Sequence, residues 1–434
     1  MKRLLLFGAL FSLGACANGR PAPPYMLVDR PLDGVLGTSP TATPAEVELV
    51  ESAPTETSLN HADVRDAADV WPELVDRAKR TLDFAQFYAS DAAGQGTSRL
   101  GPVLAAIERA IARGVRVRFL ADAVFAPKYP ATLERLRKAG ALMRIIDCGP
   151  RYGGVQHAKY MVVDGEESFV GSQNFDWRAL EHIQEIGIVV RSPVIAHELE
   201  DLFETDWALA DASTPPNARA ARDMTKRRSS AFPVTTRTGE RIALYASPKD
   251  WLIDESAWDL PRLVSMLDGA RSSVNLQVLV YSAHHRDKSS FTTLDDALRR
   301  AAARGVHVRL LVSHWGTKAD SPARASVEAL ARLPNVTVRV ITIPQWSGGE
   351  IPFARVAHAK YMVVDGTTAW IGTSNWEGDY FLKSRNVAIV AQGGKLAARL
   401  DSVFEDGWSS AYAAPLVKEP RASSTAPRED VARP

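Results

Sequence analysis

One nine-residue segment occurs twice in this chain, and the repetition constrains the fold more than any other feature. Residues 157–165 and 358–366 both read HAKYMVVDG. The similarity extends upstream, where AIERAIARGVRVRFL at 106–120 matches ALRRAAARGVHVRLL at 297–311. Matching segments around an identical core indicate that one domain has been duplicated. We therefore expect two similar domains in one chain.

The repeats divide the chain into six segments. Outside them the sequence is rich in Pro, Ser, Thr, Ala and Gly and lacks apolar periodicity, which is typical of tethers and tails without a packed core. The predicted segments are a leader at 1–16, a tether at 17–56, repeat 1 at 57–212, a linker at 213–240, repeat 2 at 241–412 and a disordered tail at 413–434.

Within each repeat, short apolar runs alternate with helical patterns. Residues 115–120, 160–163 and 186–190 have the length and composition of buried strands, whereas 103–112 and 194–209 have apolar residues at helical spacing. This alternation predicts an α/β fold with helices on both faces of each sheet.

The first residues form a candidate export signal. Lys2 and Arg3 precede an apolar stretch, residues 4–15, that is too short to span a bilayer. The stretch leads to Cys16 in a pattern that resembles a bacterial lipoprotein signal, which implies a lipid on this cysteine. In such proteins Ala17 after the cysteine favours the outer membrane. We expect a lipid-anchored protein of the bacterial cell envelope, facing the periplasm or the surface. A secreted protein with an ordinary signal is the alternative.

Composition limits the partners and the redox chemistry. The net charge is +1, so the chain as a whole has no strong attraction to nucleic acid or anionic membranes, although a local basic patch is compatible with it. The two cysteines are Cys16 and Cys148. If Cys16 is lipidated, Cys148 has no partner, so we expect no disulfide framework. We interpret Cys148 as a small buried residue rather than a nucleophile.

The repeated segment has a histidine and a lysine at alternate positions. Alternate side chains of a strand share a face. His157 and Lys159 therefore lie on one face in the first copy, as do His358 and Lys360 in the second. A buried basic face is costly unless a partner or ligand satisfies it. Two copies of the same costly face favour a functional site over a structural strand.

Further motifs follow each histidine–lysine pair. The first copy continues to Asp164 and to GSQN at 171–174, and the second to Asp365 and to GTSN at 372–375. This pattern resembles the signature of the phospholipase D superfamily, and the resemblance covers nearly all of 57–412. The flanking text looks most like the branch of animal lysosomal phospholipase D-like 5′-exonucleases and poxvirus envelope phospholipases.

The resemblance implies how the repeats assemble. It predicts two α/β/α sandwich domains with mixed sheets, packed face to face around a pseudo-twofold axis, with one active site at their interface. Both half-sites then lie in a single chain, so we expect a monomer. Asp164 and Asp365 fall on the strand face opposite the histidines. We expect them to stabilise the following turns without touching substrate.

The residue types indicate how such a site would cleave a phosphodiester. One histidine attacks phosphorus and forms a phosphohistidine, and the other protonates the leaving oxygen and then activates water or an alcohol. Lysines neutralise the phosphoryl oxygens in place of a metal, so we expect neither a metal nor another cofactor. The residues expected to contact the phosphate are Lys159, Lys360, Ser172, Asn174, Ser374 and Asn375.

A carboxylate on the second ring nitrogen strengthens a nucleophilic imidazole. Glu185 lies at the start of the predicted strand 186–190, whereas the aligned segment 384–386 of repeat 2 has no carboxylate. We therefore expect Glu185 to hold His157 as the nucleophile, with His358 as general acid and base. A solvated strand end is the alternative for Glu185.

The sequence leaves more than one substrate open. We expect phospholipids as the substrate, by hydrolysis or phosphatidyl transfer, because a lipid anchor places the enzyme beside them. The branch resemblance favours a single-strand nucleic-acid exonuclease, but the near-neutral charge does not. Cardiolipin-synthase-like transfer is a further alternative. Loop aromatics could stack bases, contact acyl chains or simply pack; they include Trp177, Trp376, Tyr380 and Phe381.

Overall fold

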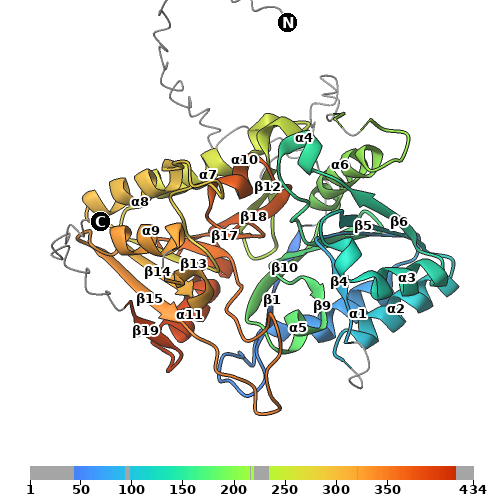
Figure 1. Ribbon diagram of the computed structural model, residues 1–434, viewed down its shortest axis with the longest axis horizontal. Coiled ribbons are helices and arrows are strands. Elements are labelled where there is room, and N and C mark those ends of the chain that lie inside the picture. The colour runs from blue at the N-terminus through green and yellow to red at the C-terminus, as the bar shows by residue number, and fades with distance from the viewer. Residues whose placement is uncertain (1–43, 93–97, 216, 219–233, 320, 417–434) are drawn as a thin grey trace, which may run out of the picture.

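The two repeats form two similar halves of the molecule. Figure 1 shows the first repeat in blue to green on the right and the second in yellow to red on the left. Each half is a mixed β-sheet covered by helices, so the predicted α/β class is confirmed. The computed structural model describes residues 44–92, 98–215, 217–218, 234–319 and 321–416. The predicted leader with Cys16 and most of the predicted tether, linker and tail lie outside these residues.

The first sheet has the strand order β2-β1-β10-β8-β7-β3-β5-β6. Its strands are β1 (Glu46–Ser52), β2 (Arg65–Asp66), β3 (Thr81–Gln86), β5 (Arg116–Asp122), β6 (Leu142–Ile146), β7 (Tyr160–Val163), β8 (Glu167–Gly171) and β10 (Glu185–Arg191). β3, β5 and β6 are parallel neighbours, whereas β7, β8, β10 and β1 pair antiparallel. A separate pair consists of β4 (Ala89–Ser90) and β9 (Phe175–Asp176).

Strand β1 corrects the predicted boundary of the tether. The prediction ended the tether at residue 56, but β1 pairs with β10 along its whole length, from Glu46 opposite Arg191 to Ser52 opposite Glu185. Alternating acidic and apolar residues at 46–50 allow a strand with one buried face. This polar alternation made the segment resemble the unstructured chain before it.

The second sheet repeats this topology. Its order is β11-β12-β18-β17-β16-β13-β14-β15-β19, so β12 takes the place of β1 and β18 that of β10. The strands are β11 (Val234–Thr235), β12 (Arg241–Ser247), β13 (Ser273–Val278), β14 (His307–Ser313), β15 (Val336–Ile341), β16 (Tyr361–Val364), β17 (Thr368–Gly372), β18 (Asn386–Gln392) and β19 (Ala413–Pro415). The outer strand β19 extends repeat 2 slightly beyond its predicted end.

Helices cover the sheets. They are α1 (Ala67–Arg77), α2 (Gly101–Ala112), α3 (Pro130–Ala139), α4 (Gly149–Tyr152), α5 (Trp177–Glu181), α6 (Pro193–Leu209), α7 (Asp259–Gly269), α8 (Thr293–Ala303), α9 (Pro322–Leu330), α10 (Gly378–Leu382) and α11 (Leu396–Ser409). Of these, α2 and α6 lie at the two positions predicted from the sequence. After α2 and α8 the chain turns at Gly114 and Gly305, whose φ values of 89° and 90° favour glycine. No helix in the described part of the chain is both long and apolar enough to cross a bilayer.

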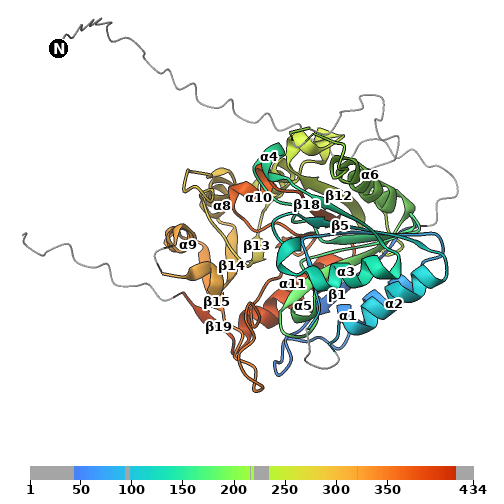
Figure 2. The same ribbon diagram turned by 45° about the vertical axis from the view of Figure 1, so that its right-hand side comes forward.

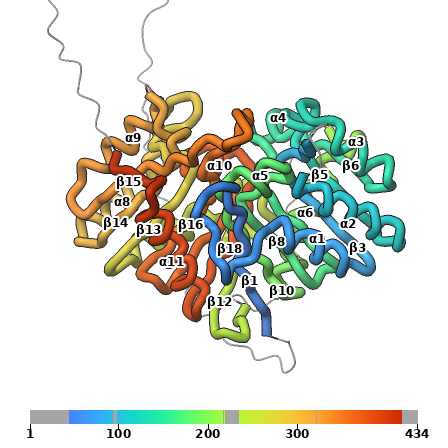
Figure 3. The backbone as a smooth tube through the Cα atoms, turned by 90° about the horizontal axis from the view of Figure 1, so that it is seen from below, coloured from blue at the N-terminus to red at the C-terminus, as the bar shows by residue number. Residues whose placement is uncertain are grey.

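One hydrophobic cluster extends across both halves, and a second cluster lies within the first repeat. Ile186 and Ile188 of β10 belong to the same buried cluster as Val387 and Ile389 of β18. Strands β8 and β10 contact β17 and β18, and Figure 3 shows β8, β10 and β18 in the middle of the molecule. Helix α6 of the first repeat also packs against β12 of the second (Figure 2). The interface between the repeats is therefore a packed interior.

The aspartates that follow the repeated histidines hold a neighbouring loop. Asp164 accepts hydrogen bonds from the backbone N–H groups of residues 79–81, just before β3, at 2.7–2.8 Å. Asp365 binds the backbone of residues 271–273 before β13 in the same way. Both are therefore structural, as expected, but they stabilise the loop that leads into the adjacent strand. The prediction placed this effect in the turn that follows each aspartate.

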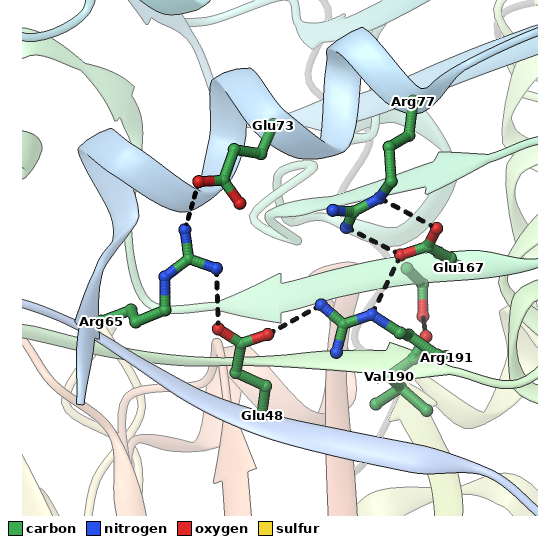
Figure 4. A network of polar contacts seen from close by, with 8 residues as sticks. Glu48, Arg65, Glu73, Arg77, Glu167, Val190 and Arg191 are labelled. Carbon is green, nitrogen blue, oxygen red and sulfur yellow. Dashed lines mark hydrogen bonds and ion pairs between the residues drawn. The ribbon is translucent and has the colours of Figure 1, made fainter. Parts of the chain in front are cut away.

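A chain of ion pairs ties α1 to the end of the first sheet (Figure 4). Arg65 contacts both Glu73 and Glu48, at 2.5 and 3.3 Å, and Glu48 also binds Arg191 at 2.7 Å. Arg191 in turn contacts Glu167, at 3.3 Å. Arg191 is the last residue of β10 and Glu185 is the first. This network therefore lies at the opposite end of β10 from Glu185.

Candidate active site

The segments that lead to the two histidines cross between the repeats. The backbone N–H of His157 donates to the carbonyl of Arg385 at 2.9 Å, and Arg385 donates to Val155 at 3.0 Å. In the other half His358 donates to Gln184 at 2.8 Å, and Gln184 donates to the carbonyl of residue 356 at 3.0 Å. Each histidine is thus held by the start of the last long strand of the opposite repeat. This reciprocal exchange brings both motifs to the interface, as the resemblance predicted.

Each imidazole has one nitrogen fixed by a side chain from the opposite repeat. His157 Nδ1 lies 2.9 Å from Asn386 Oδ1, and Asn386 also accepts a 2.9 Å hydrogen bond from the Thr373 hydroxyl. His358 Nδ1 lies 2.9 Å from both carboxylate oxygens of Glu185. These acceptors favour a proton on Nδ1, which leaves Nε2 of each ring for chemistry.

The partner of Glu185 contradicts the sequence prediction. We expected this carboxylate to hold His157, because both residues lie in the first repeat. The carboxylate instead binds His358, since the start of β10 pairs with the histidine segment of the other repeat. The predicted basis for naming His157 as the nucleophile is therefore wrong. The alternative of a solvated strand end is also excluded, because Glu185 is fully buried.

The two lysines are fully buried beside the histidines. Lys159 Nζ donates to the carbonyl of His157 at 2.6 Å, and Lys360 makes the same bond to His358. Burial lowers the pKa of Lys360 to about 7, although the negative charge of Glu185 opposes the shift. Burial and the charge of Lys360 also lower the pKa of Lys159 well below its usual value. A bound phosphate would compensate both amines, so the site is arranged for an anion.

The same environment depresses both imidazoles. Burial, followed by the charges of Lys159 and Lys360, lowers the pKa of His157 well below its usual value. Burial also lowers the pKa of His358, but Glu185 acts in the opposite direction. Glu185 therefore makes positive charge easier to place on His358 than on His157.

Three of the four residues predicted to bind substrate have buried polar atoms without a partner. They are Asn174, Ser374 and Asn375. The unpaired atom is Oδ1 in both asparagines, which only accepts hydrogen bonds, and Oγ in Ser374, which can donate to a phosphoryl oxygen. The fourth, Ser172, is different. Its hydroxyl donates to the carbonyl of Ile186 and accepts from the N–H of the same residue, both at 3.1 Å. The Ser172 hydroxyl is therefore bound to the backbone of β10, and its contact with substrate stays a prediction.

The sequence interpretation missed a second buried carboxylate. Asp122 ends β5, and its two oxygens accept the backbone N–H groups of Gln156 at 2.8 Å and Val124 at 2.9 Å. Burial raises its pKa to about 6. Its negative charge acts to raise the pKa of Lys159. The available signal was an acidic residue directly after the apolar run 119–121.

Two aromatic rings contact His157. The centroid of the Phe87 ring is 4.9 Å from that of His157, and the Tyr380 ring is 4.8 Å away on the second repeat. Phe87 directly follows β3, and its counterpart after β13 is Leu279. Tyr380 lies six residues before Asn386, and the counterpart six residues before Glu185 is Ala179. The His157 half therefore has two rings where the His358 half has aliphatic side chains.

Other residues singled out in the sequence lie away from the chemistry. Trp376 and Phe381 are buried in the core, so loop packing accounts for them. Cys148 is buried, and burial raises the pKa of its thiol well above the usual value. This agrees with its interpretation as a small buried residue. Among the described residues, no three His, Cys, Asp or Glu side chains are grouped so that they could hold a metal ion.

Comparison with known proteins agrees with this geometry. The family described as "Cardiolipin synthase, PLD-like domain" matches residues 73–207 and 263–408. The chain belongs to the phospholipase D superfamily. The cattle protein "5'-3' exonuclease PLD3" is 32% identical over 424 residues, covering 91% of this chain and 82% of its own length. "Phospholipase D Z" of Dictyostelium discoideum is 28% identical over 393 residues, covering 85% and 90%.

A solved structure supports the same fold. The phosphatidylserine synthase of Haemophilus influenzae has a TM-score of 0.56 at 13% identity, covering 80% of this chain and 85% of its own. At this identity the likeness concerns the fold alone. As a member of the phospholipase D superfamily, the chain is a phosphodiesterase, and the two motifs supply the halves of its site.

Proposed function

We propose that this phospholipase D-type enzyme hydrolyses phosphodiesters of single-stranded nucleic acid through a covalent phosphohistidine. The observation that supports the chemistry is the paired arrangement of two imidazoles, each with Nδ1 bound and a buried lysine beside it. The lysines supply the positive charge that phosphoryl oxygens require. Activity should therefore survive treatment with a chelator.

We assign the nucleophile to His358 and the general acid to His157. The negative charge of the bound phosphate favours a second proton on His157, at Nε2. Nε2 of His358 attacks phosphorus, the bond from phosphorus to the leaving oxygen breaks, and Nε2–H of the His157 imidazolium protonates that oxygen. His157 then takes a proton from water, which attacks phosphorus and releases His358. A phosphorylated imidazole carries positive charge. Glu185 contacts the ring of His358 and can stabilise this charge there.

A phosphodiester with a p-nitrophenyl leaving group tests this assignment, because such a group departs without a general acid. His157→Ala should give a burst of nitrophenolate and leave phosphate on a peptide that contains residue 358. His358→Ala should give neither burst nor label. A burst confined to His358→Ala, with label at residue 157, would reverse the roles. Loss of the burst in both variants, with unchanged melting temperatures, would contradict a phosphohistidine.

Nucleic acid is the substrate class that we favour over phospholipid. Relatives named as exonucleases are 32% identical over most of this chain. Aromatic side chains beside His157 are suited to stacking on bases, which sequence-independent single-strand binding requires. Phospholipid is the second candidate, because other relatives are named phospholipases D and because the leader resembles a lipoprotein signal. A side-by-side assay on single-stranded DNA, phosphatidylcholine vesicles and a chromogenic diester separates the two.

We also propose that Cys16 anchors the enzyme to the bacterial cell envelope. The motif at 13–16 and the apolar stretch before it support this proposal. Expression with labelled fatty acid should label the chain, and Cys16→Ser should remove the label and release the protein from the membrane fraction. A fully soluble, unlabelled wild-type protein would instead support the secreted form.

A further inference from the structure

The rings around His157 continue into a longer aromatic surface on repeat 1. Phe87 packs against Phe125 with ring centroids 4.0 Å apart. Phe125 stacks on Tyr88 at 5.8 Å, and Tyr88 stacks on Tyr129 at 5.0 Å. All four side chains are partly exposed. We refer to Phe87, Tyr88, Phe125 and Tyr129 as the aromatic strip, which begins at His157 and leads away from it.

Positive charge accompanies the aromatic strip. The ammonium of the exposed Lys128 lies 4.0 Å from the centroid of the Phe125 ring. On the other side of His157, the guanidinium of Arg286 lies 5.1 Å from the Tyr380 ring. Rings next to cations form the pattern with which proteins bind a single strand, because bases stack on the rings and phosphates attract the cations.

The strip is held rigidly from below. The guanidinium of Arg178 lies 5.5 Å from the centroid of the Tyr129 ring. Arg178 in turn pairs with Asp176, which caps helix α5. Rings fixed in this way lose little conformational entropy when a planar group stacks on them. A flexible acyl chain gains less from such preorganised planes.

We propose that the aromatic strip and Tyr380 bind the departing part of the substrate, and that this part is a nucleoside with a planar base. The proposal rests on the proposed function, in particular on His157 as the acid that protonates the leaving group. The group that departs must lie on the side of the acid, where Phe87 and Tyr380 flank the imidazole. The retained part then faces the half with Leu279 and Ala179, which provides no rings at these positions.

The dinucleotide dTpdT provides a direct test, because it has one phosphodiester bond and two bases. We would compare it with two analogues in which the 5′ or the 3′ nucleoside has an abasic sugar. The product that carries the phosphate identifies which nucleoside departs. For the wild type, loss of the departing base should lower kcat/KM about 10-fold or more, and loss of the retained base should have a smaller effect.

The test variants replace each ring beside His157 with the residue type found at the matching position of the other half. Phe87→Leu and Tyr380→Ala should lower kcat/KM about 10-fold more on dTpdT than on the analogue without a departing base. Tyr380→Phe keeps the ring and should retain the dependence on the base. Leu279→Ala is the matched control in the other half and should also retain it. Melting temperatures confirm that each variant is folded.

Two failures can be told apart. Equal loss of activity on dTpdT and on both abasic analogues in Phe87→Leu and Tyr380→Ala would overturn the proposal while leaving nuclease function intact. Dependence on the retained base alone would overturn it too. If the wild type cleaves phosphatidylcholine vesicles but neither dTpdT nor single-stranded DNA, the proposed substrate fails, and the base-binding role fails with it.

Discussion

The half-site around His157 and the half-site around His358 share a backbone but differ in their surroundings. Backbone hydrogen bonds to the opposite repeat and the lysine contacts are the same in both. The partner of the imidazole differs, since Asn386 binds His157 whereas Glu185 binds His358. The rings beside His157 also have aliphatic counterparts. Symmetry therefore supplies the framework of the site, and the substitutions that break symmetry give the two histidines different surroundings.

The largest effect is expected from removing the carboxylate that contacts the imidazole of His358. Glu185→Gln should lower kcat about 10³-fold, since an amide stabilises the charged ring poorly. Asn386→Ala, the matched change in the other half, should cost about 10-fold because it removes a neutral hydrogen bond. Stopped-flow release of nitrophenolate measures both. Equal losses in the two variants would show that the half-sites are chemically equivalent.

The positions before Glu185 and Asn386 allow a second comparison. Arg385 is fully buried and binds Asp206 of α6 through two bonds, at 2.7 and 2.9 Å. The side chain of its counterpart Gln184 makes an uncharged hydrogen bond, in which Oε1 accepts from Nε2 of Gln277 at 2.6 Å. Arg385→Gln should lower the free energy of unfolding by about 3–5 kcal/mol, because Asp206 remains buried without its partner.

Urea denaturation measures this loss. The matched variant Gln184→Ala should cost only about 1–3 kcal/mol, the penalty of one unsatisfied polar group. The double replacement of Arg385 by Met and Asp206 by Leu should recover most of the stability, since no charge is then buried. Similar losses for Arg385→Gln and Gln184→Ala would mean that the two halves are joined with equal strength.

Lys360 should affect activity and stability in opposite directions. Lys360→Met should lower kcat/KM about 10²-fold, through loss of phosphate stabilisation. The pKa of this amine is about 7 in the folded chain and near 10.5 when exposed. Between these values the unfolded chain binds more protons, so the free energy of unfolding of the wild type should rise with pH across this window. Below pH 7 the cost of the buried charge is fully present.

Thermal melts at pH 7 and pH 9 test this sign. Relative to Lys360→Met, the wild type should gain stability at the higher pH. Binding of inorganic phosphate at pH 8 should also take up protons, because the anion restores the charge of the lysines. A pH-independent difference between wild type and variant would show that Lys360 is charged throughout.

The smallest effect is expected at the far end of β10. Glu48 is partly exposed and contacts two arginines of the network in Figure 4. Glu48→Gln should cost less than about 1 kcal/mol, and less still in high salt. Catalysis should not change, because Glu185 lies at the other end of the strand. A reduced kcat would show that the two ends of β10 are coupled.

Local sequence signals predicted the duplicated α/β halves and the buried histidine–lysine faces. The alternate spacing of histidine and lysine and the identity of the two nine-residue segments are visible in the sequence itself. His157, Lys159, His358 and Lys360 could therefore be found directly. The partner of Glu185 could not be found, because it depends on which segment lies beside it after the repeats have packed. Alignment of one repeat on the other suggested a neighbour within the same half.

Other features depended on context in a similar way. Strand β1 was hidden by its alternating acidic residues, and Ser172 was assigned to substrate by its motif although the backbone of Ile186 uses its hydroxyl. Phe87 and Tyr380 have aliphatic counterparts at the matching positions of the other repeat. The sequence shows that these residue types differ, but the contact of both rings with His157 is visible only in the structure. The sequence did not show that Asp122 belongs to the site, because this follows from its contact with the backbone of Gln156, the residue before His157.

The crossing of the histidine segments also bears on how such a chain could arise. Each imidazole is oriented by a side chain from the partner repeat, so one repeat expressed alone lacks a complete set of contacts for its own histidine. A single-repeat ancestor would have worked as a pair of identical subunits, in which any change appears on both sides of the substrate. Fusion of two genes removes that restriction, and specialised positions such as Glu185 and Asn386 can then diverge within one polypeptide.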